Sequence, residues 1–256
     1  MKIDLICRYR SEDLLRRLTG SAFKNAIGEF GVISEFDKEG LPKIAESYNR
    51  MASKSNADIL CFVHDDVEFL SEDWDSTVSD LFEEFEPDVL GVVGVTKYDG
   101  GRTFDAGNPH MAGVVCVDQK GTAFVKCLSP KFRYKKAATV DGLIMFVSRK
   151  YWESNKFDES FDGLFFYDID LCLRGNVGIT CSILVKHSKP KELYGKYPEA
   201  MKPIETYWDA FHAKHGLTSP VLGDQACAMT SLDDFYRNGQ TDCYEWFRRE
   251  KQCVSA

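Results

Sequence analysis

The sequence predicts an α/β fold in which a mostly parallel, doubly wound sheet carries helices on both faces. Strand-like and helix-like runs alternate through roughly the first 100 residues, which is the order that builds such a sheet. The run from 59 to 63 is apolar at every position, as expected for a central parallel strand buried on both faces. With 44% hydrophobic and 28% charged residues, the composition is that of an ordinary globular protein.

The individual elements follow from short apolar runs and from helical spacing. We expect strands over the runs that read KIDLICRY, FGVISEF, ADILCFV and VLGVVGV, which are residues 2–9, 30–36, 57–63 and 89–95. We expect helices over residues 11–23, 41–55 and 73–86. Ser11 is the expected N-cap of the first helix, and Pro42 is compatible with the first turn of the second.

The later part of the chain is less regular. Residues 96–140 are rich in glycine and predict a small antiparallel extension, with a hairpin that turns at residues 119–121. A strand leading into a helix is expected over 138–154, a further helix within 163–178, and a late strand within 179–190. The tail from about residue 191 is helical in pattern and is expected to wrap the domain or mediate assembly.

Charge and cysteine content exclude several classes of protein. The net charge of −8 argues against a surface that binds nucleic acid everywhere, although a local basic patch remains compatible with it. No apolar run approaches the roughly 20 residues of a membrane span, and the N-terminus has no apolar signal region of ordinary length. The nine cysteines form no CxxC pair, which favours reduced, buried thiols in a cytoplasmic protein.

The sequence HDDVE, at residues 64–68, directly follows the apolar strand. Carboxylates beside a buried strand are unfavourable unless something neutralises them. A Mg²⁺ or Mn²⁺ ion would do so, and such ions commonly bridge carboxylates to substrate phosphates. One interpretation is therefore a metal–diphosphate site at Asp66, helped by Asp65 or Glu68. The alternative is a loop whose acids favour the N-terminus of the next helix.

A second acidic pair, Asp168 and Asp170, follows a run of aromatic residues. A carboxylate among apolar neighbours has a raised pKa and suits a general base. The alternatives are an N-cap and an ordinary helical ion pair between Asp170 and Arg174. His187 ends the late strand and could complete a metal site on the same sheet edge, or simply be a hydrogen-bonded surface residue. His64 could merely support the loop.

Taken together, these motifs resemble a known family. SYNRMASKSNADILCFVHDDVEFL is similar to the nucleotide-sugar half of GT-A-fold glycosyltransferases of the broad family 2 group, and its HDDV-type motif resembles the StrF-like branch. The later segment VDGLIMFVSRKYWESNKFDESFDGLFFYDIDLCLR resembles the acceptor side of that group, and LVKHS its late histidine strand. The resemblance covers about residues 1–190. It implies a GT-A domain with a nucleotide-sugar half (about 1–100) and an acceptor half (about 101–190), followed by a helical extension over 191–256.

The resemblance implies roles for particular residues. Asp66, Glu68 and His187 match metal-binding positions, and Asp168 matches the general base of inverting members. Tyr167 departs from the pattern, which usually has glutamate there, and the third-strand motif departs from a plain DxD. The positions at which members hold the nucleotide correspond to Cys7, Arg8, Asn49 and Asp65.

The expected activity is metal-dependent transfer of a sugar from a nucleotide-diphosphate sugar to an acceptor hydroxyl, with inversion. The cofactor would be Mn²⁺ or Mg²⁺. Basic and aromatic residues alternate over 131–138, which suits a phosphate-bearing acceptor such as a modified nucleobase in DNA. A small molecule or a glycan is the other expected acceptor. The alternatives to a transferase are a non-catalytic nucleotide-sugar binding module and a metal-dependent phosphohydrolase.

Overall fold

Two β-sheets form the centre of the fold in the computed structural model, which describes residues 1–37, 43–98, 100, 110–119, 122–129, 132–161, 166–188 and 197–217. The larger sheet has the order β2-β1-β3-β11-β5-β12-β9. Its strands β1, β2, β3, β5 and β12 run in one direction, and β11 and β9 run in the other. The bounds are Phe30–Phe36, Ile3–Tyr9, Ile59–Val63, Ile144–Ser148, Val89–Gly91, Val177–Ile179 and Lys135–Ala137, in sheet order.

The second sheet has the order β10-β6-β7-β13-β4, with β8 paired to β7 outside this path. Its strands are Thr139–Val140, Val93–Val95, Met111–Gln119, Val185–Ser188 and Val67–Phe69, and β8 is Thr122–Ser129. β7 and β8 pair antiparallel, which confirms the predicted hairpin. Lys120 and Gly121 of its turn lie outside the described residues.

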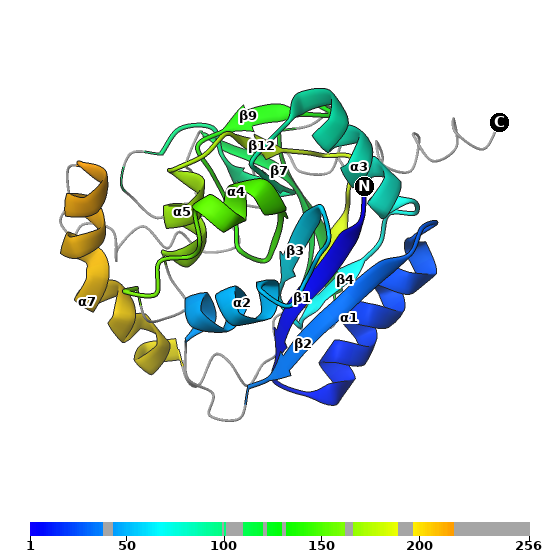
Figure 1. Ribbon diagram of the computed structural model, residues 1–256, viewed down its shortest axis with the longest axis horizontal. Helices are drawn as coiled ribbons and strands as arrows, with labels where there is room; N and C mark the ends of the chain where they lie inside the picture. The colour runs from blue at the N-terminus through cyan, green and yellow to red at the C-terminus, as the bar shows by residue number, and fades with distance from the viewer. Residues whose placement is uncertain are drawn as a thin grey trace.

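Helices cover both faces of the larger sheet (Figure 1). α1 (Glu12–Asn25) and α3 (Trp74–Phe85) pack with the β3 residues Ile59, Cys61 and Val63. α2 (Ile44–Ala52), α4 (Arg149–Ser154) and α5 (Tyr167–Cys172) pack with the alternate β3 residues Leu60 and Phe62. The fully buried β3 is thus the two-sided central strand that its sequence predicts.

Local sequence signals account for several helix ends. Ser11 caps α1 as expected, because its hydroxyl accepts a hydrogen bond from the backbone N–H of Leu14 (3.2 Å). Pro42 lies outside the described residues. α5 begins after Phe166, whose φ of 70° places a bulky residue in the left-handed region. Neighbouring aromatic rings hold Phe166 there, since Phe166 stacks on Phe211 with centroids 4.5 Å apart.

The structure corrects one strand prediction. Residues 89–95 form two strands, β5 and β6, that belong to different sheets and meet at Val92. The chain also passes between the two sheets at 64–66, from β3 to β4, and at 141–143, from β10 to β11. These three passages form a seam between the sheets. The passage at 64–66 contains the predicted acidic motif, and the passage at 141–143 lies beside it.

α7 (Tyr197–His215) lies beyond residue 190, where we expected the GT-A domain to end. Trp208 and Phe211 of this helix form a buried aromatic cluster with Phe161 and Phe166.

The buried carboxylate of Asp170 on α5 is a second point of contact with α7. It accepts hydrogen bonds from Lys214 Nζ (2.5 Å) and His215 Nε2 (2.9 Å). It also accepts one from Arg174 Nη2 (2.9 Å), which is the helical ion pair expected as an alternative role for Asp170. α7 is therefore joined to α5 by both apolar packing and ion pairs.

Two further sequence expectations concern cysteines and membranes. Five cysteines in the described part of the chain are free and buried: Cys7, Cys61, Cys116, Cys172 and Cys181. Among the described residues, no helix is both long and apolar enough to cross a bilayer.

Candidate functional site

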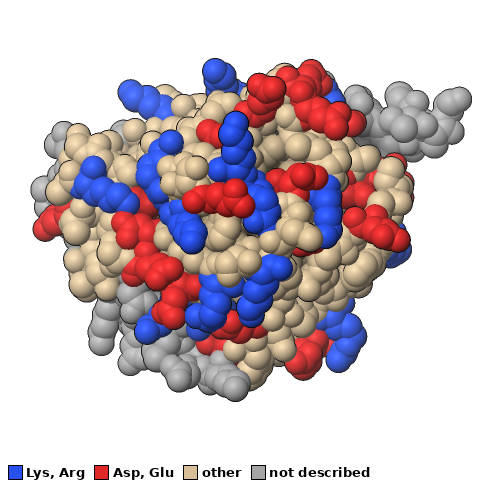
Figure 2. Space-filling view, in the orientation of Figure 1, with Lys and Arg blue, Asp and Glu red and all other residues tan. Residues whose placement is uncertain are grey.

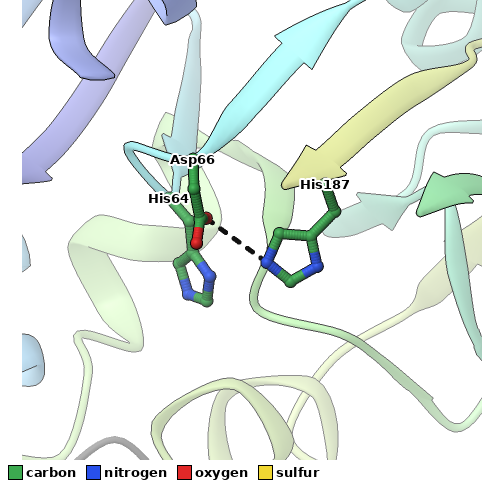
Figure 3. Close-up of side chains that lie close together, drawn as sticks. All are labelled: His64, Asp66 and His187. Carbon is green, nitrogen blue, oxygen red and sulfur yellow. Dashed lines mark ion pairs between the residues drawn. The ribbon is translucent and has the colours of Figure 1, made fainter. Parts of the chain in front are cut away.

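His64, Asp66 and His187 come together at the seam between the sheets (Figure 3). Each offers one ligand atom, and these atoms lie within 4.8 Å of one another. Asp66 and His187 point toward each other, with 3.3 Å between Oδ1 and Nε2. The three residues come from two segments far apart in sequence, the β3–β4 passage and strand β13.

The backbone fixes these positions. The N–H of His64 donates to the carbonyl of Leu143 (3.0 Å), and the N–H of Ser188 donates to the carbonyl of Asp66 (2.8 Å). The antiparallel register of β13 with β4 places His187 opposite Val67. The side chains therefore converge because two strand ends and the 141–143 passage are joined by main-chain hydrogen bonds.

The electrostatics of this group suit a cation. Burial raises the pKa of Asp66, but the two histidines and Arg10 outweigh burial and hold it well below the ordinary value. Burial lowers the pKa of His64, which favours the neutral imidazole that metals require. Oδ1 of Asp66 is buried and accepts no hydrogen bond of ordinary geometry.

Arg10 neutralises the acidic pair from the end of β1. Its backbone N–H donates to Oδ2 of Asp65 (2.6 Å), and its guanidinium contacts Asp65 and also Oδ2 of Asp66 (3.1 Å). Burial lowers the pKa of Arg10, and the two carboxylates outweigh this and raise it. Asp65, predicted to bind the nucleotide, is thus buried and committed to Arg10.

Glu68, a predicted metal ligand, is not part of this group. It lies on β4 between Val67 and Phe69, which are buried, and so points to the opposite side of the strand. Its carboxylate forms an ion pair with Lys186 (3.2 Å). His64 is the third member of the group instead.

Asp168 lies at the first turn of α5, next to the same seam. Its Oδ2 accepts from the N–H of Gly142 (2.9 Å) and its Oδ1 from that of Ile169 (2.9 Å). Burial and the charge of Asp141 raise the pKa of Asp168 to about 7. A carboxylate with this pKa is well matched to proton abstraction near neutral pH.

Tyr167 connects Asp168 to His64. Its hydroxyl lies 2.9 Å from Nε2 of His64. A methyl group on Gly142 would come within 2.0 Å of the Tyr167 hydroxyl and 3.1 Å of Oδ2 of Asp168. Only glycine therefore fits between the two side chains.

Two of the residues predicted to bind nucleotide lie at the end of β1. The Cys7 side chain is fully buried in the core, and burial raises the pKa of its thiol. Arg8 reaches across to β2, where Nη2 contacts Oδ1 of Asp37 (2.7 Å).

Asn49, also predicted to bind nucleotide, is engaged inside the protein. Its side-chain nitrogen donates to the carbonyl of Phe157 (2.9 Å) and to Glu159 (2.8 Å). Its side-chain oxygen accepts from Trp152 Nε1 (3.3 Å) and from the N–H of Phe157 (3.1 Å). The amide thus joins α2 to the segment that follows α4.

Replacing Asn49 by alanine is therefore expected to lower the free energy of unfolding by about 2–4 kcal/mol, because several buried polar groups lose their partner. The folded fraction should keep its affinity for nucleotides. Urea denaturation and titration with a nucleotide measure the two effects. Glu159→Ala, a change at the exposed end of the same network, should alter stability by about 0.5 kcal/mol. A large loss of nucleotide affinity in stable, folded Asn49→Ala protein would support the predicted nucleotide-binding role.

The donor set fits a divalent metal ion. It combines two imidazoles with a carboxylate that is ionised and has an unsatisfied buried oxygen. Mixed nitrogen and oxygen ligands suit first-row transition ions, whereas Mg²⁺ takes oxygen ligands almost alone. With three protein ligands, further coordination positions are left for substrate oxygens.

Sequence reasoning missed two contributors and gave a third only a supporting role. Arg10 had a local signal, since it follows β1 at the sheet edge where ligands bind. Asp141 lies in the Asp–Gly turn between β10 and β11, but its effect on Asp168 depends on folding. For His64 the sequence leaves support of its loop as an alternative, and only the folded structure places it beside His187 in the candidate metal-binding group.

The fold is similar to that of several proteins of known structure. The chain is similar to GalNAc-T7 in a crystal structure with UDP, GalNAc and Mn²⁺, at 12% identity and a TM-score of 0.55, over 93% of this chain and 56% of that one. It is also similar to residues 1–349 of S. aureus TarS in a crystal structure with UDP, at 13% identity and a TM-score of 0.50, over 91% of this chain and 77% of that one. The chain thus spans little more than half the length of the GalNAc-T7 structure.

These likenesses concern the fold, and they confirm the predicted GT-A class. No curated protein shows a significant sequence match. The model of a family described as glycosyltransferase-like matches residues 33–190, more than half of the chain, including His64, Asp66, Asp168 and His187. The chain belongs to this glycosyltransferase-like family.

Proposed function

We propose that this protein is a metal-dependent glycosyltransferase that uses a nucleotide-diphosphate sugar as donor. The observation that carries the proposal is the convergence of His64, Asp66 and His187 beside a carboxylate, Asp168, whose pKa is about 7. The GT-A fold and the family support the same reaction class. Within the family, the HDDV sequence favours the StrF-like branch.

The three ligands would hold the cation, and Mn²⁺ fits them better than Mg²⁺ because two of them are imidazoles. The ion would supply charge stabilisation of the leaving diphosphate. Arg10 lies against Asp66 and is about one third exposed (34% of its side chain). Its guanidinium is therefore placed to contact the same diphosphate.

Asp168 would act as the general base. It accepts the proton of the acceptor hydroxyl while that oxygen forms a bond to the anomeric carbon. The bond from the anomeric carbon to the diphosphate oxygen breaks, and its electron pair leaves with the nucleotide. Attack from the face opposite the leaving group inverts the anomeric configuration. The hydrogen bonds from Gly142 and Ile169 orient the carboxylate for this step.

The distribution of charged side chains on the surface bears on the nature of the acceptor. Lys135 and Lys136 are exposed on the edge strand β9, whereas Arg133 is paired with Glu84. Basic and acidic side chains are interspersed over the face seen in Figure 2, with no continuous basic surface there. On this face, the distribution supports a small-molecule or glycan acceptor over duplex DNA, whose binding rests on many phosphate contacts.

A thermal-shift screen tests the donor and the metal together. Each nucleotide-sugar is added with Mn²⁺, with Mg²⁺ or with EDTA. We expect one donor to raise the melting temperature in Mn²⁺ and to have little effect in EDTA, because a ligand that binds only the native state stabilises it. Release of the nucleotide from that donor, with an acceptor or by slow hydrolysis, then separates a transferase from a binding module. Equal stabilisation in EDTA would contradict the metal-dependent site.

A further inference from the structure

We propose that Tyr167 is a positioning residue that orients the imidazole of His64 so that its Nδ1 faces the cation site. The inference rests on the proposed function, because it concerns how the metal-binding group is held. Tyr167 occupies the position at which the resemblance expects glutamate, so the resemblance does not account for its role.

A hydrogen bond joins the side chains of Tyr167 and His64. The Tyr167 hydroxyl lies 2.9 Å from Nε2 of His64. A neutral imidazole carries a single N–H, and a nitrogen that binds a cation must offer its lone pair. With Nε2 engaged by the hydroxyl, Nδ1 is the nitrogen left for the cation. The proton then lies on Nε2, and the oxygen of Tyr167 accepts it.

Packing holds the Tyr167 side chain rigidly in place. Its side chain is only 1% exposed, and its ring packs against Tyr48 and Phe157, with centroids 5.9 Å apart in both cases. Phe166 precedes it in a left-handed conformation, which is unfavourable for a bulky residue by roughly 1–2 kcal/mol and persists only where packing enforces it. The hydroxyl therefore has one position, and it aims at His64.

The position of Tyr167 in the chain couples it to the candidate base. It directly precedes Asp168, and both side chains border Gly142. A shift of the first turn of α5 would move the base and the partner of His64 together. Tyr167 thus links the metal-binding group to the segment that carries the base.

The test measures the affinity for Mn²⁺ alone, from the electron paramagnetic resonance signal of the free ion, on the full chain. Tyr167→Phe keeps the ring and removes only the hydroxyl. We expect its affinity for Mn²⁺ to fall about 10–100-fold, as is typical when the hydrogen-bond partner of a ligating histidine is lost. The matched control is Tyr151→Phe, which removes another buried hydroxyl that donates to α5, at the carbonyl of Leu171 (2.7 Å). It should lose stability without a change in Mn²⁺ affinity.

The outcomes separate this inference from the proposed function. Wild-type affinity in Tyr167→Phe, together with lost binding in His64→Ala, would overturn the role of Tyr167 and leave the metal site standing. Absence of Mn²⁺ binding in the wild-type protein would overturn both. Equal loss in Tyr167→Phe and Tyr151→Phe would show a general effect of a loosened core and would also overturn the inference. Melting temperatures in EDTA identify any variant that does not fold.

Discussion

Replacing Asp168 with asparagine is expected to lower kcat by about 10²–10⁴-fold, the usual contribution of a positioned general base. Asparagine preserves the side-chain shape and can still accept one backbone hydrogen bond, but it cannot take the proton of the acceptor. Binding of the nucleotide with Mn²⁺ should be unchanged. Initial rates of transfer and calorimetric titration with the nucleotide measure the two properties. Wild-type kcat in this variant would remove Asp168 from the mechanism.

The pH dependence gives a second measurement on the same group. With a pKa of about 7, the base loses activity as the pH falls below 7, and the rate should level off above it. Asp141→Asn is the matched control. It removes a charge that raises the pKa of Asp168, so the acid limb of its profile should move to lower pH.

The same group also makes stability depend on pH. An unfolded aspartate has a pKa of about 4, so protonated Asp168 stabilises the fold at low pH, and this contribution is lost as the pH rises from about 4 through 7. Asp168→Asn should therefore be more stable than the wild type at pH 8, by about 1–3 kcal/mol, and the difference should shrink toward pH 4. Urea denaturation at the two pH values measures it.

Replacing Asp66 with asparagine is expected to weaken Mn²⁺ binding by at least about 100-fold, because loss of a ligand exceeds the 10–100-fold effect of losing an outer partner. Transfer activity should fall with it. The lowered pKa of Asp66 means that its carboxylate stabilises the fold above the ordinary pKa of aspartate and that this is lost in acid. The variant should therefore also be less stable at pH 7.

Glu68→Gln is the decisive control for Asp66. It neutralises a different acid of the HDDVE sequence, one that pairs with Lys186 and lies outside the metal-binding group. Its Mn²⁺ affinity and activity should be close to those of the wild type. If Glu68→Gln lost binding and Asp66→Asn kept it, the ligand assignment made from the structure would be reversed.

Much of the fold could be predicted because its early elements carry local signals. The β1 and β2 runs, the Ser11 cap and the two-sided β3 follow from apolar patterning and capping alone. The division of residues 89–95 between two sheets could not be predicted in this way. Nothing in its run of valines marks Val92 as a crossing point, and Gly94 is needed only because the carbonyl of Thr139 comes so close, 2.1 Å from where a Cβ would lie.

Some residues of the candidate site could be predicted from local motifs, and others are found only in the folded structure. Asp66, Asp168 and His187 were predicted from motifs, and the structure brings Asp66 and His187 into one group with Asp168 nearby. The exchange of Glu68 for His64 depends on β4 being a short strand, because strand alternation turns position 68 away from the site. The pairing of Arg10 with Asp65 joins residues 55 apart in sequence, and only the folded sheet brings them together.

The ion pairs between α7 and Asp170 have a consequence for the order of synthesis. Asp170 is fully buried, and two of the side chains that hydrogen-bond to it, Lys214 and His215, follow 44 and 45 residues later. A buried carboxylate that lacks its partners is destabilising by about 3–5 kcal/mol. During translation, Arg174 already pairs with Asp170, but the segment around Asp170 reaches its full stability only once residues 214 and 215 have been made, beyond the end of the family-like region at residue 190.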